Sequence, residues 1–169
     1  MKYNLLIADP LSEDGIQPLK DASKINIVMN KDWSTEKLLE NIGNFDALIV
    51  RSQTQVTREL LERATNLRII GRAGVGVDNI DIDAATERGI IVVNAPNGNT
   101  NSAAEHTMAM LMALSRKIPQ AYLALKNHQW NRKKYIGVEL KDKTLGIIGL
   151  GRIGAEVAYR ARGQRMNVI

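Results

Sequence analysis

The sequence predicts an α/β fold, in which a parallel sheet with helices on both faces is followed by the first elements of a second parallel unit. Two observations predict this fold. Up to about residue 95, apolar runs of strand length alternate with amphipathic segments, and the runs begin roughly 21 residues apart. Near the end of the chain, another apolar run leads through a glycine-rich turn into an amphipathic segment.

The alternating segments define five strands and four helices. Each apolar run is nearly continuous, as expected for strands of a parallel sheet that are buried on both sides. The expected strands are Leu5–Ala8, Ile25–Met29, Ala47–Val50, Leu67–Ile70 and Ile90–Val93. The expected helices, each with one apolar face, are Glu13–Asp21, Thr35–Ile42, Arg58–Ala64 and Asp81–Arg88. Right-handed crossovers would join the strands.

A polar, turn-rich stretch at residues 94–101 changes the character of the chain and predicts a hinge or domain boundary. A long helix is expected over Ser102–Lys117, because Ser102 and Glu105 match the capping box. Pro119 is expected to end or redirect this helix, and a second helix follows through Tyr122. The methionines of the long helix are interpreted as core residues: Met108, Met110 and Met112.

The glycine-rich turn has the spacing of a dinucleotide-binding fingerprint. Gly149, Gly151 and Gly154 follow the apolar run Thr144–Ile148 and precede a helical pattern. In such a turn, the first glycine allows the bend, the second lets a pyrophosphate approach the backbone, and the third lets helix and strand pack. An ordinary strand-to-helix turn remains the alternative. The acidic residue that would distinguish NAD from NADP is expected beyond Ile169, at the end of the next strand.

Composition excludes several classes of protein. The chain is 44% hydrophobic and 24% charged and contains no cysteine, so a disulfide framework and cysteine-based metal or catalytic sites are excluded, and no metal site is expected. No apolar run approaches the length of a signal core or a membrane span, and we expect a cytoplasmic protein without membrane contact. The net charge of +5 is scattered and aromatic residues make up 4%, which argues against nucleic-acid binding.

Two loops at strand ends carry candidate binding groups. In α/β sheets, ligands bind beyond the carboxyl ends of the strands. Arg51 and Ser52 follow one strand and would offer charge-assisted hydrogen bonds to an anion. Gly74 and Gly76 follow the next strand, where backbone N–H groups would approach a carboxylate or phosphate. The alternative is that Arg51 only pairs with a nearby acid and that the glycines only form a turn.

Together, these motifs resemble the D-isomer-specific 2-hydroxyacid dehydrogenases, whose order they share. The matching segments are Arg51–Thr54, Gly71–Asn79, Asn94–Asn99 and Gly149–Gly154. Three further segments, Ser102–Glu105, Trp130–Lys133 and Gly137–Leu140, are most similar to the members that oxidise 3-phospho-D-glycerate at C2 with NAD, the first step of the phosphorylated route to serine. The resemblance implies a flavodoxin-like substrate-binding domain over residues 1–97 and the beginning of a Rossmann NAD-binding domain over residues 98–169.

The resemblance also implies roles for individual residues. Those expected to bind or orient the substrate are Arg51, Ser52 and Arg72 for its phosphate end, Gly74 and Gly76 for its carboxylate, and Asn99 at the hinge. Those expected to hold the cofactor NAD are Val75 on the nicotinamide side and Gly149, Gly151, Arg152, Ile153 and Gly154 around the pyrophosphate. A homodimer or higher homo-oligomer is expected through the long helix and the segment around Trp130.

No catalytic residue is assigned within the chain. The family's arginine, glutamate and histidine, the last acting as the base, are expected downstream of Ile169. Glu105 and His106 are adjacent, and adjacent helix positions do not face each other, so they make a poor catalytic pair. His128 lies in a polar stretch and is expected to be solvated. Residues 1–169 alone are therefore expected to be inactive, as a piece of a larger polypeptide with exposed apolar strand faces around Ile147 and Val168.

Three functions remain open at this point. The first is the NAD-dependent oxidation of 3-phospho-D-glycerate to 3-phosphohydroxypyruvate, and the second is another D-2-hydroxyacid dehydrogenase acting on glyoxylate, hydroxypyruvate or lactate. The third is a non-catalytic NAD-sensing binding protein. Arg51, Ser52 and the basic run Arg132–Lys134 favour a phosphorylated 2-hydroxy acid, since a small neutral-tailed substrate needs less cationic lining.

Overall fold

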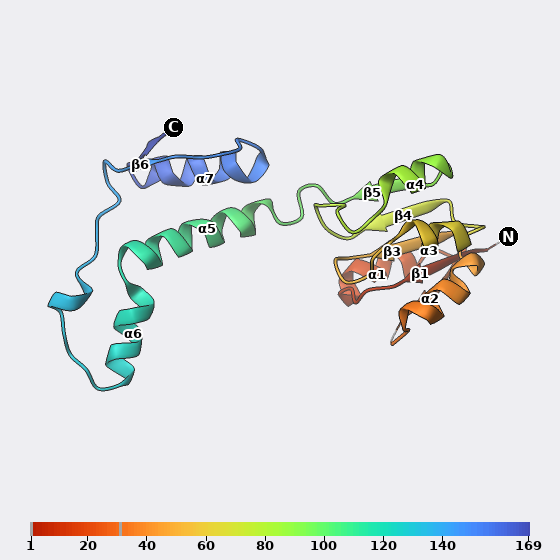
Figure 1. Cartoon of the computed structure of the whole chain (residues 1–169), viewed down its shortest axis with the longest axis horizontal. Coiled ribbons are helices and arrows are strands. Elements are labelled where there is room, and N and C mark those ends of the chain that lie inside the picture. The colour runs from red at the N-terminus through yellow and green to blue at the C-terminus, as the bar shows by residue number, and fades with distance from the viewer. Residues whose placement is uncertain (1, 31) are drawn as a thin grey trace. The chain divides into compact units, whose positions relative to one another are not determined.

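The computed structural model describes residues 2–30 and 32–169. The chain forms two compact units, one ending at Gly98 and the other spanning Asn99–Ile169 (Figure 1).

The first unit is built on a five-stranded parallel sheet, which confirms the predicted α/β fold. Its strands are β1 (Tyr3–Ile7), β2 (Ile25–Met29), β3 (Ala47–Val50), β4 (Ile69–Arg72) and β5 (Ile91–Asn94), in the order β2-β1-β3-β4-β5. This order is that of flavodoxin-like sheets, in which the chain changes direction of winding between the first and third strands. β4 lies two residues later than predicted, because Gly71 and Arg72 pair with Ile49 and Val50.

Four helices connect these strands: α1 (Glu13–Lys20), α2 (Thr35–Asn41), α3 (Arg58–Arg63) and α4 (Ile82–Glu87), with a 3₁₀ turn η1 (Ile42–Asn44) after α2. Each begins at a polar residue whose side chain accepts a hydrogen bond from a first-turn N–H group. The capping residues are Ser12, Ser34, Thr57 and Asp81. Such caps satisfy N–H groups that a helix start otherwise leaves unpaired, which explains why the helices start where they do.

The two faces of the sheet are covered unequally. Leu6, Leu48 and Ile70 point into a core that is shared with α2, α3 and α4. The alternate residues Leu5 and Ile7 pack with Ile16 of α1 in a separate core on the other face. That second core does not extend over β4 and β5, where Ile69, Ile91 and Val93 are 37%, 60% and 47% exposed. Within the described residues, helices therefore cover both faces only at the β2-β1-β3 side.

An ion pair joins α3 to α4 on the covered face. Arg58 donates hydrogen bonds of 2.6 and 3.2 Å to the two carboxylate oxygens of Glu87. These bonds, with the attraction of the guanidinium charge, lower the pKa of Glu87 below its ordinary value. The contribution of this pair to stability is present above the ordinary pKa of glutamate and is lost as the pH falls through the lowered pKa.

The second unit is a small helical layer on a two-stranded parallel sheet. Its elements are α5 (Thr100–Ser115), α6 (Ile118–Lys126), η2 (Lys133–Tyr135), β6 (Thr144–Leu145), α7 (Arg152–Gly163) and β7 (Asn167–Val168). β6 pairs with β7, and α5 packs against α7. Their shared core is formed by Ala104, Met108, Val157, Ala161 and Met166.

Several local predictions in this unit were wrong. α5 begins earlier than predicted, with Asn99 at its N-cap position, and Ser102 lies inside the helix, where its hydroxyl donates to the Asn99 carbonyl instead of forming a capping box. Pro119 lies in the first turn of α6, which begins after Lys117 turns the chain at a φ of 53°. Such a position suits proline because its missing N–H would be unpaired there anyway.

The predicted strand Thr144–Ile148 is also shorter in the structure. Leu145 and Ile147 pack on the helical core, whereas Ile148 is fully exposed. The expected exposure around Ile147 and Val168 is therefore found at Ile148 and Ile169. Of the three methionines predicted to fill the core, only Met108 does so, and Met110 and Met112 are 59% and 39% exposed.

The central position of β4 gives a direct test of this packing. Ile70 is fully buried and Ile91 is 60% exposed, on neighbouring strands. We expect Ile70→Ala to lower the free energy of unfolding by about 2–5 kcal/mol, because it removes buried surface and leaves a cavity. Ile91→Ala should cost about 1 kcal/mol or less. Urea denaturation of both variants measures the difference, and equal losses would contradict the described core.

Candidate functional site

Parallel pairing brings the ends of the central strands together at one edge of the sheet. Val50, Arg72 and Asn94 lie opposite one another in the registers of β3, β4 and β5. The segment after β3 (residues 51–55, the β3 loop) and the segment after β4 (residues 73–80, the β4 loop) therefore leave the sheet side by side. We call this the carboxyl edge, and Asp9, which follows β1, lies at the same edge because Ile7 is paired with Ile49.

The Arg51 guanidinium projects from the β3 loop without an acidic partner. It is exposed, and its one hydrogen bond, of 3.4 Å, goes to the Pro10 carbonyl. No carboxylate of the described residues lies within ion-pair distance of it. The alternative that Arg51 serves only to neutralise a nearby acid is therefore not supported, and the cation beside the exposed Ser52 is free to bind an anion.

Arg72, the last residue of β4, lies half-buried against Gly74. A Cβ atom added to Gly74 would overlap the Arg72 guanidinium, so the glycine leaves space for this side chain in the orientation that it adopts here. The Nε–H group of Arg72 is buried and has no hydrogen-bond partner within the part of the chain that the structure describes. Buried donors normally have partners, and an anionic ligand would supply one here.

The β4 loop also presents main-chain donors. The Gly74 N–H donates to the Arg72 carbonyl, but the N–H groups of Val75, Gly76 and Val77 find no acceptor among residues 2–30 and 32–169. The Val75 carbonyl is fixed by the side-chain amide of Asn94, at 2.7 Å. Successive free N–H groups of this kind form a concavity that suits a carboxylate or phosphate oxygen.

Two buried polar residues that sequence reasoning missed hold these loops in place. Asp9 accepts hydrogen bonds from the backbone of Arg51 and from Thr54, and Asn79 donates to the carbonyls of the same two residues. The clearest sequence signal was the position of Asp9, a carboxylate directly after the apolar run of β1. Asn79 lies within the quoted glycine motif but had no role assigned.

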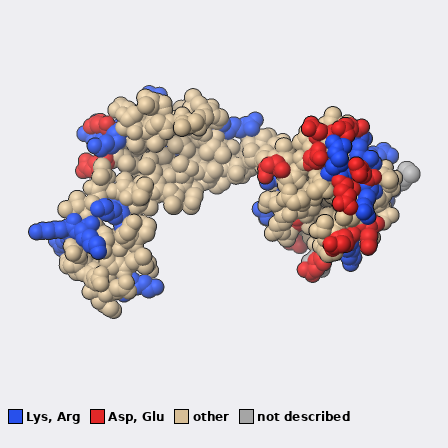
Figure 2. Space-filling model, in the orientation of Figure 1, with Lys and Arg blue, Asp and Glu red and all other residues tan. Residues whose placement is uncertain are grey.

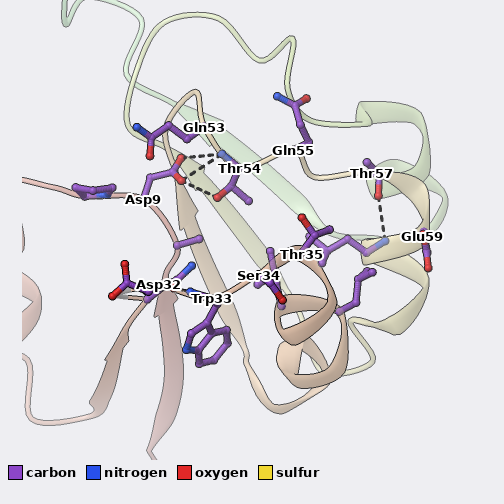
Figure 3. A pocket seen from close by; sticks show the side chains of 16 residues that line it. Asp9, Asp32, Trp33, Ser34, Thr35, Gln53, Thr54, Gln55, Thr57 and Glu59 are labelled. Atoms are coloured by element: carbon purple, nitrogen blue, oxygen red, sulfur yellow. Dashed lines mark hydrogen bonds between the residues drawn. The ribbon is translucent and has the colours of Figure 1, made fainter.

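A cavity of about 610 Å³ lies between β1, α2 and α3, at the point where the strand order changes direction (Figure 3). Asp9, Thr54 and Trp33 are among its lining residues, and Figure 3 shows Asp9 bonded to Thr54 on its rim. Arg51, Ser52, Arg72, Gly74 and Gly76 do not line it. The cavity is therefore lined by the later residues of the β3 loop, Gln53–Gln55, whereas the predicted substrate residues of that loop are Arg51 and Ser52.

The glycine turn of the second unit has the geometry that a pyrophosphate requires. Gly149 has a φ of +97°, a conformation that other residues rarely adopt. A Cβ atom at Gly154 would overlap the Gly149 carbonyl, so this glycine lets α7 pack on the turn. A Cβ atom at Gly151 would meet nothing within 4 Å, which means that the protein itself leaves this space open.

The start of α7 is open to an anion. Its N-cap is Gly151, no side chain caps the first turn, and no acidic residue lies in it. The unpaired N–H groups at a helix N-terminus and the helix dipole attract a phosphate. Arg152 and Ile153 form this first turn, so all five predicted pyrophosphate residues, Gly149, Gly151, Arg152, Ile153 and Gly154, are adjacent in the fold and fit the group.

The remaining candidates are polar residues of the second unit. Asn99 is exposed at the N-cap of α5, where its side chain makes no capping bond. His106 and His128 are exposed, and neither imidazole makes a hydrogen bond within the described residues. No group of acidic and histidine side chains in the described ranges is placed to hold a metal ion. None of the described helices combines the length and the apolar character that a membrane crossing demands.

A parallel sheet with unpaired cations and open amides at its carboxyl edge defines an α/β protein whose free donors at that edge suit a small anion. A family model described as D-isomer specific 2-hydroxyacid dehydrogenase, catalytic domain, matches residues 5–164. The chain therefore belongs to the D-isomer-specific 2-hydroxyacid dehydrogenase family.

The chain is similar to enzymes of known name. Over 166 residues it is 54% identical to D-3-phosphoglycerate dehydrogenase of Bacillus subtilis (strain 168), covering 98% of this chain and 31% of the relative. The chain thus spans about a third of the length of this curated relative.

Solved structures share the fold. A glyoxylate reductase from Paecilomyes thermophila matches with a TM-score of 0.88 at 29% identity, over 99% of this chain and 54% of its own. NAD+-bound 3-phosphoglycerate dehydrogenase from Entamoeba histolytica matches with a TM-score of 0.78 at 32% identity, over 99% of this chain and 53% of its own.

The tight contact at Gly154 generates a prediction with a matched control in the same helix. Gly154→Ala should lower the free energy of unfolding by about 1–3 kcal/mol and weaken NAD binding, because the added methyl displaces the Gly149 carbonyl from the turn. A Cβ at Gly163 meets nothing within 4 Å, so Gly163→Ala should stabilise by up to about 1 kcal/mol. Thermal unfolding and NAD titration measure both effects. Unchanged NAD affinity in Gly154→Ala would contradict the assigned role of the turn.

Proposed function

We propose that the chain is the amino-terminal portion of an NAD-dependent D-3-phosphoglycerate dehydrogenase, which oxidises 3-phospho-D-glycerate at C2 to 3-phosphohydroxypyruvate. The observation that supports this most is the 54% identity over nearly the whole chain to a relative of that name. Identity to the glyoxylate reductase structure is 29%. The cationic and amide groups of the carboxyl edge agree with a substrate that has two anionic ends.

Each end of the substrate is assigned to a different set of groups. Arg51, Ser52 and Arg72 bind the phosphate end or orient the substrate, using an exposed unpaired guanidinium, a hydroxyl and an orphaned Nε–H donor. The N–H groups around Gly76 bind the carboxylate. Because the Gly74 N–H already has an internal acceptor, Gly74 serves the site by leaving room for Arg72. Asn99, at the start of α5 in the second unit, is assigned to the substrate on the family resemblance alone.

The cofactor is assigned to the glycine turn and to the β4 loop. Gly149, Gly151, Arg152, Ile153 and Gly154 would hold the pyrophosphate, and Val75 would touch the nicotinamide side. When bound, NAD accepts the hydride that leaves C2 of the substrate. The proton of the C2 hydroxyl needs a base, and neither exposed histidine of this chain makes a hydrogen bond, among the described residues, that would orient it for that role. We assign the base to a residue outside this chain, so residues 1–169 alone should not turn over substrate.

Two alternatives differ in what the intact polypeptide would do. A D-2-hydroxyacid dehydrogenase of the glyoxylate or hydroxypyruvate reductase type is favoured by the TM-score of 0.88 to such an enzyme. A non-catalytic NAD-sensing protein would bind the cofactor through the same glycine turn but would show no turnover with any of these acids.

The substrate preference and the arginine roles are tested in one experiment. The complete polypeptide should reduce NAD with 3-phospho-D-glycerate far more efficiently than it oxidises NADH with glyoxylate or hydroxypyruvate. Arg51→Ala and Arg72→Ala should each raise KM for 3-phospho-D-glycerate by about tenfold or more, with little change in KM for NAD, since each removes a charge-assisted hydrogen bond to substrate. Arg68, exposed next to the other end of β4, provides the control Arg68→Ala.

The outcomes of this experiment separate the alternatives. A preference for glyoxylate or hydroxypyruvate would replace the phosphoglycerate proposal with the second function, and NAD binding without turnover would replace it with the third. An equal rise of both KM values in Arg51→Ala would mean that Arg51 acts as a structural residue.

A homo-oligomer is the partner that we propose. Large apolar side chains along α5 and α6 are exposed, including Leu114 at 72% and Tyr122 at 62%, and Trp130 after α6 is 69% exposed. Single exposed apolar residues are common, but such a continuous set usually marks an interface. Figure 2 shows Lys and Arg gathered around η2, which contains Lys133 and Lys134, and these cations would help attract an anionic substrate.

The proposed interface makes a separate prediction. Leu114→Lys should shift the complete protein to a smaller mass in light scattering, because it places a charge in an apolar contact. Tyr159→Lys is the matched control, since Tyr159 on α7 is 71% exposed but outside α5 and α6. An unchanged mass in Leu114→Lys would remove α5 from the subunit contact.

A further inference from the structure

We propose that Asp9 and Asn79 are positioning residues of the substrate site. They act by hydrogen bonding to both ends of the Arg51–Thr54 segment, Asp9 to its N–H groups and Asn79 to its carbonyl groups. This inference rests on the proposed function, because it assigns their effect to Arg51 and Ser52. Neither residue has a role from the family match or from the motifs of the sequence.

Asp9 holds the segment by accepting hydrogen bonds from the N–H groups of Arg51 and Thr54. Its carboxylate accepts the Arg51 N–H at 2.5 Å, the Thr54 N–H at 3.2 Å and the Thr54 hydroxyl at 2.6 Å. Asp9 is only 3% exposed, and no cation of the described residues lies within ion-pair distance of it. A buried carboxylate needs compensation for its lost hydration. Here the β3 loop provides that compensation, so the loop conformation and the buried charge depend on each other.

Asn79 holds the same segment by donating hydrogen bonds to the carbonyl groups of Arg51 and Thr54. Its amide Nδ2 donates to the Arg51 carbonyl at 2.8 Å and to the Thr54 carbonyl at 2.7 Å, and the residue is 5% exposed. Two carbonyl acceptors fix the orientation of the amide, because the Oδ1 atom could not bond to either of them. Asn79 belongs to the β4 loop, so its side chain ties the two loops of the site together.

The segment is therefore attached by four backbone groups, two at Arg51 and two at Thr54, while Ser52 and Gln53 between them stay free. Arg51 and Thr54 are each held at both backbone groups, by Asp9 at N–H and by Asn79 at C=O. Ser52 and Gln53 between them are exposed, and their N–H groups make no hydrogen bond within the described residues. A fixed base with an open tip restricts the directions in which the Arg51 guanidinium and the Ser52 hydroxyl can point, which reduces the entropy lost when substrate binds.

The first measurement does not depend on activity. Asp9→Asn replaces one acceptor oxygen by a donor, and amide hydrogen exchange at Arg51 and Thr54 should accelerate by about tenfold or more while Ile49 in β3 is unchanged. Thr54→Val removes only the hydroxyl bond to Asp9, and Thr54→Ser retains it, so Thr54→Ser should restore the protection that Thr54→Val loses. An unchanged exchange rate of the Arg51 amide in Asp9→Asn would contradict the proposal that Asp9 holds this segment.

The second measurement asks whether the grip acts through Arg51. In the complete enzyme, Asp9→Asn and Thr54→Val should raise KM for 3-phospho-D-glycerate by about tenfold, with KM for NAD unchanged. In an Arg51→Ala background, Asp9→Asn should have less than about a twofold further effect, since coupled residues are not additive. An undiminished effect in that background would overturn the positioning role.

A control separates positioning from general stability. Asp46 accepts the Asn4 N–H at 2.8 Å next to the opposite edge of the sheet, so Asp46→Asn removes a comparable carboxylate-to-backbone bond far from the site. It should lower the unfolding midpoint without changing KM for substrate. A KM rise in Asp46→Asn equal to that in Asp9→Asn would overturn the inference. If the complete protein does not oxidise phosphoglycerate, the proposed function fails, while the exchange comparison still decides whether Asp9 and Asn79 grip the loop.

Discussion

The parallel register of β1, β3, β4 and β5 is the constraint on which the candidate substrate site depends. Leu6, Leu48 and Ile70 lie on one face of these strands and are fully buried, and a one-residue slip of any strand would move its apolar residues to the wrong face. The same register decides that the segments after Ile7, Val50 and Arg72 emerge at one edge. The strand register alone therefore brings the cations, the open backbone amides and the buried Asp9 to the same edge of the sheet.

The physical reason for a glycine differs from one position of the candidate site to the next. Gly74 leaves room for the guanidinium of Arg72, and Gly154 leaves room for the carbonyl of Gly149. Gly149 adopts a positive φ. Gly151, by contrast, faces open space, so the protein's own packing gives no reason for its small size, whereas the proposed pyrophosphate would give one. The motif spacing alone does not distinguish these cases.

Much of the fold of the first unit was predictable, because strand burial and helix caps are local properties of the sequence. β2 and β3 were predicted to the residue, since their apolar runs end at clear polar boundaries. The capping box at Ser102 failed because the helix begins earlier, with Asn99 at its N-cap position, and Ile148 is exposed beyond the end of the two-residue strand β6. Asp9 and Asn79 were missed because their partners lie 25 to 45 residues away in the chain, which no local pattern records.

The central proposal is that the carboxyl edge binds the anionic substrate through an arginine with no acidic partner and through donors with no acceptor among the described residues. The most direct measurement is the ¹H–¹⁵N signal of the Arg72 Nε–H group in the complete protein, titrated with 3-phospho-D-glycerate and, separately, with glycerol. The account predicts a saturable downfield shift with phosphoglycerate alone, because the buried donor gains a charged acceptor. An unchanged Arg72 signal at concentrations that saturate turnover would contradict it.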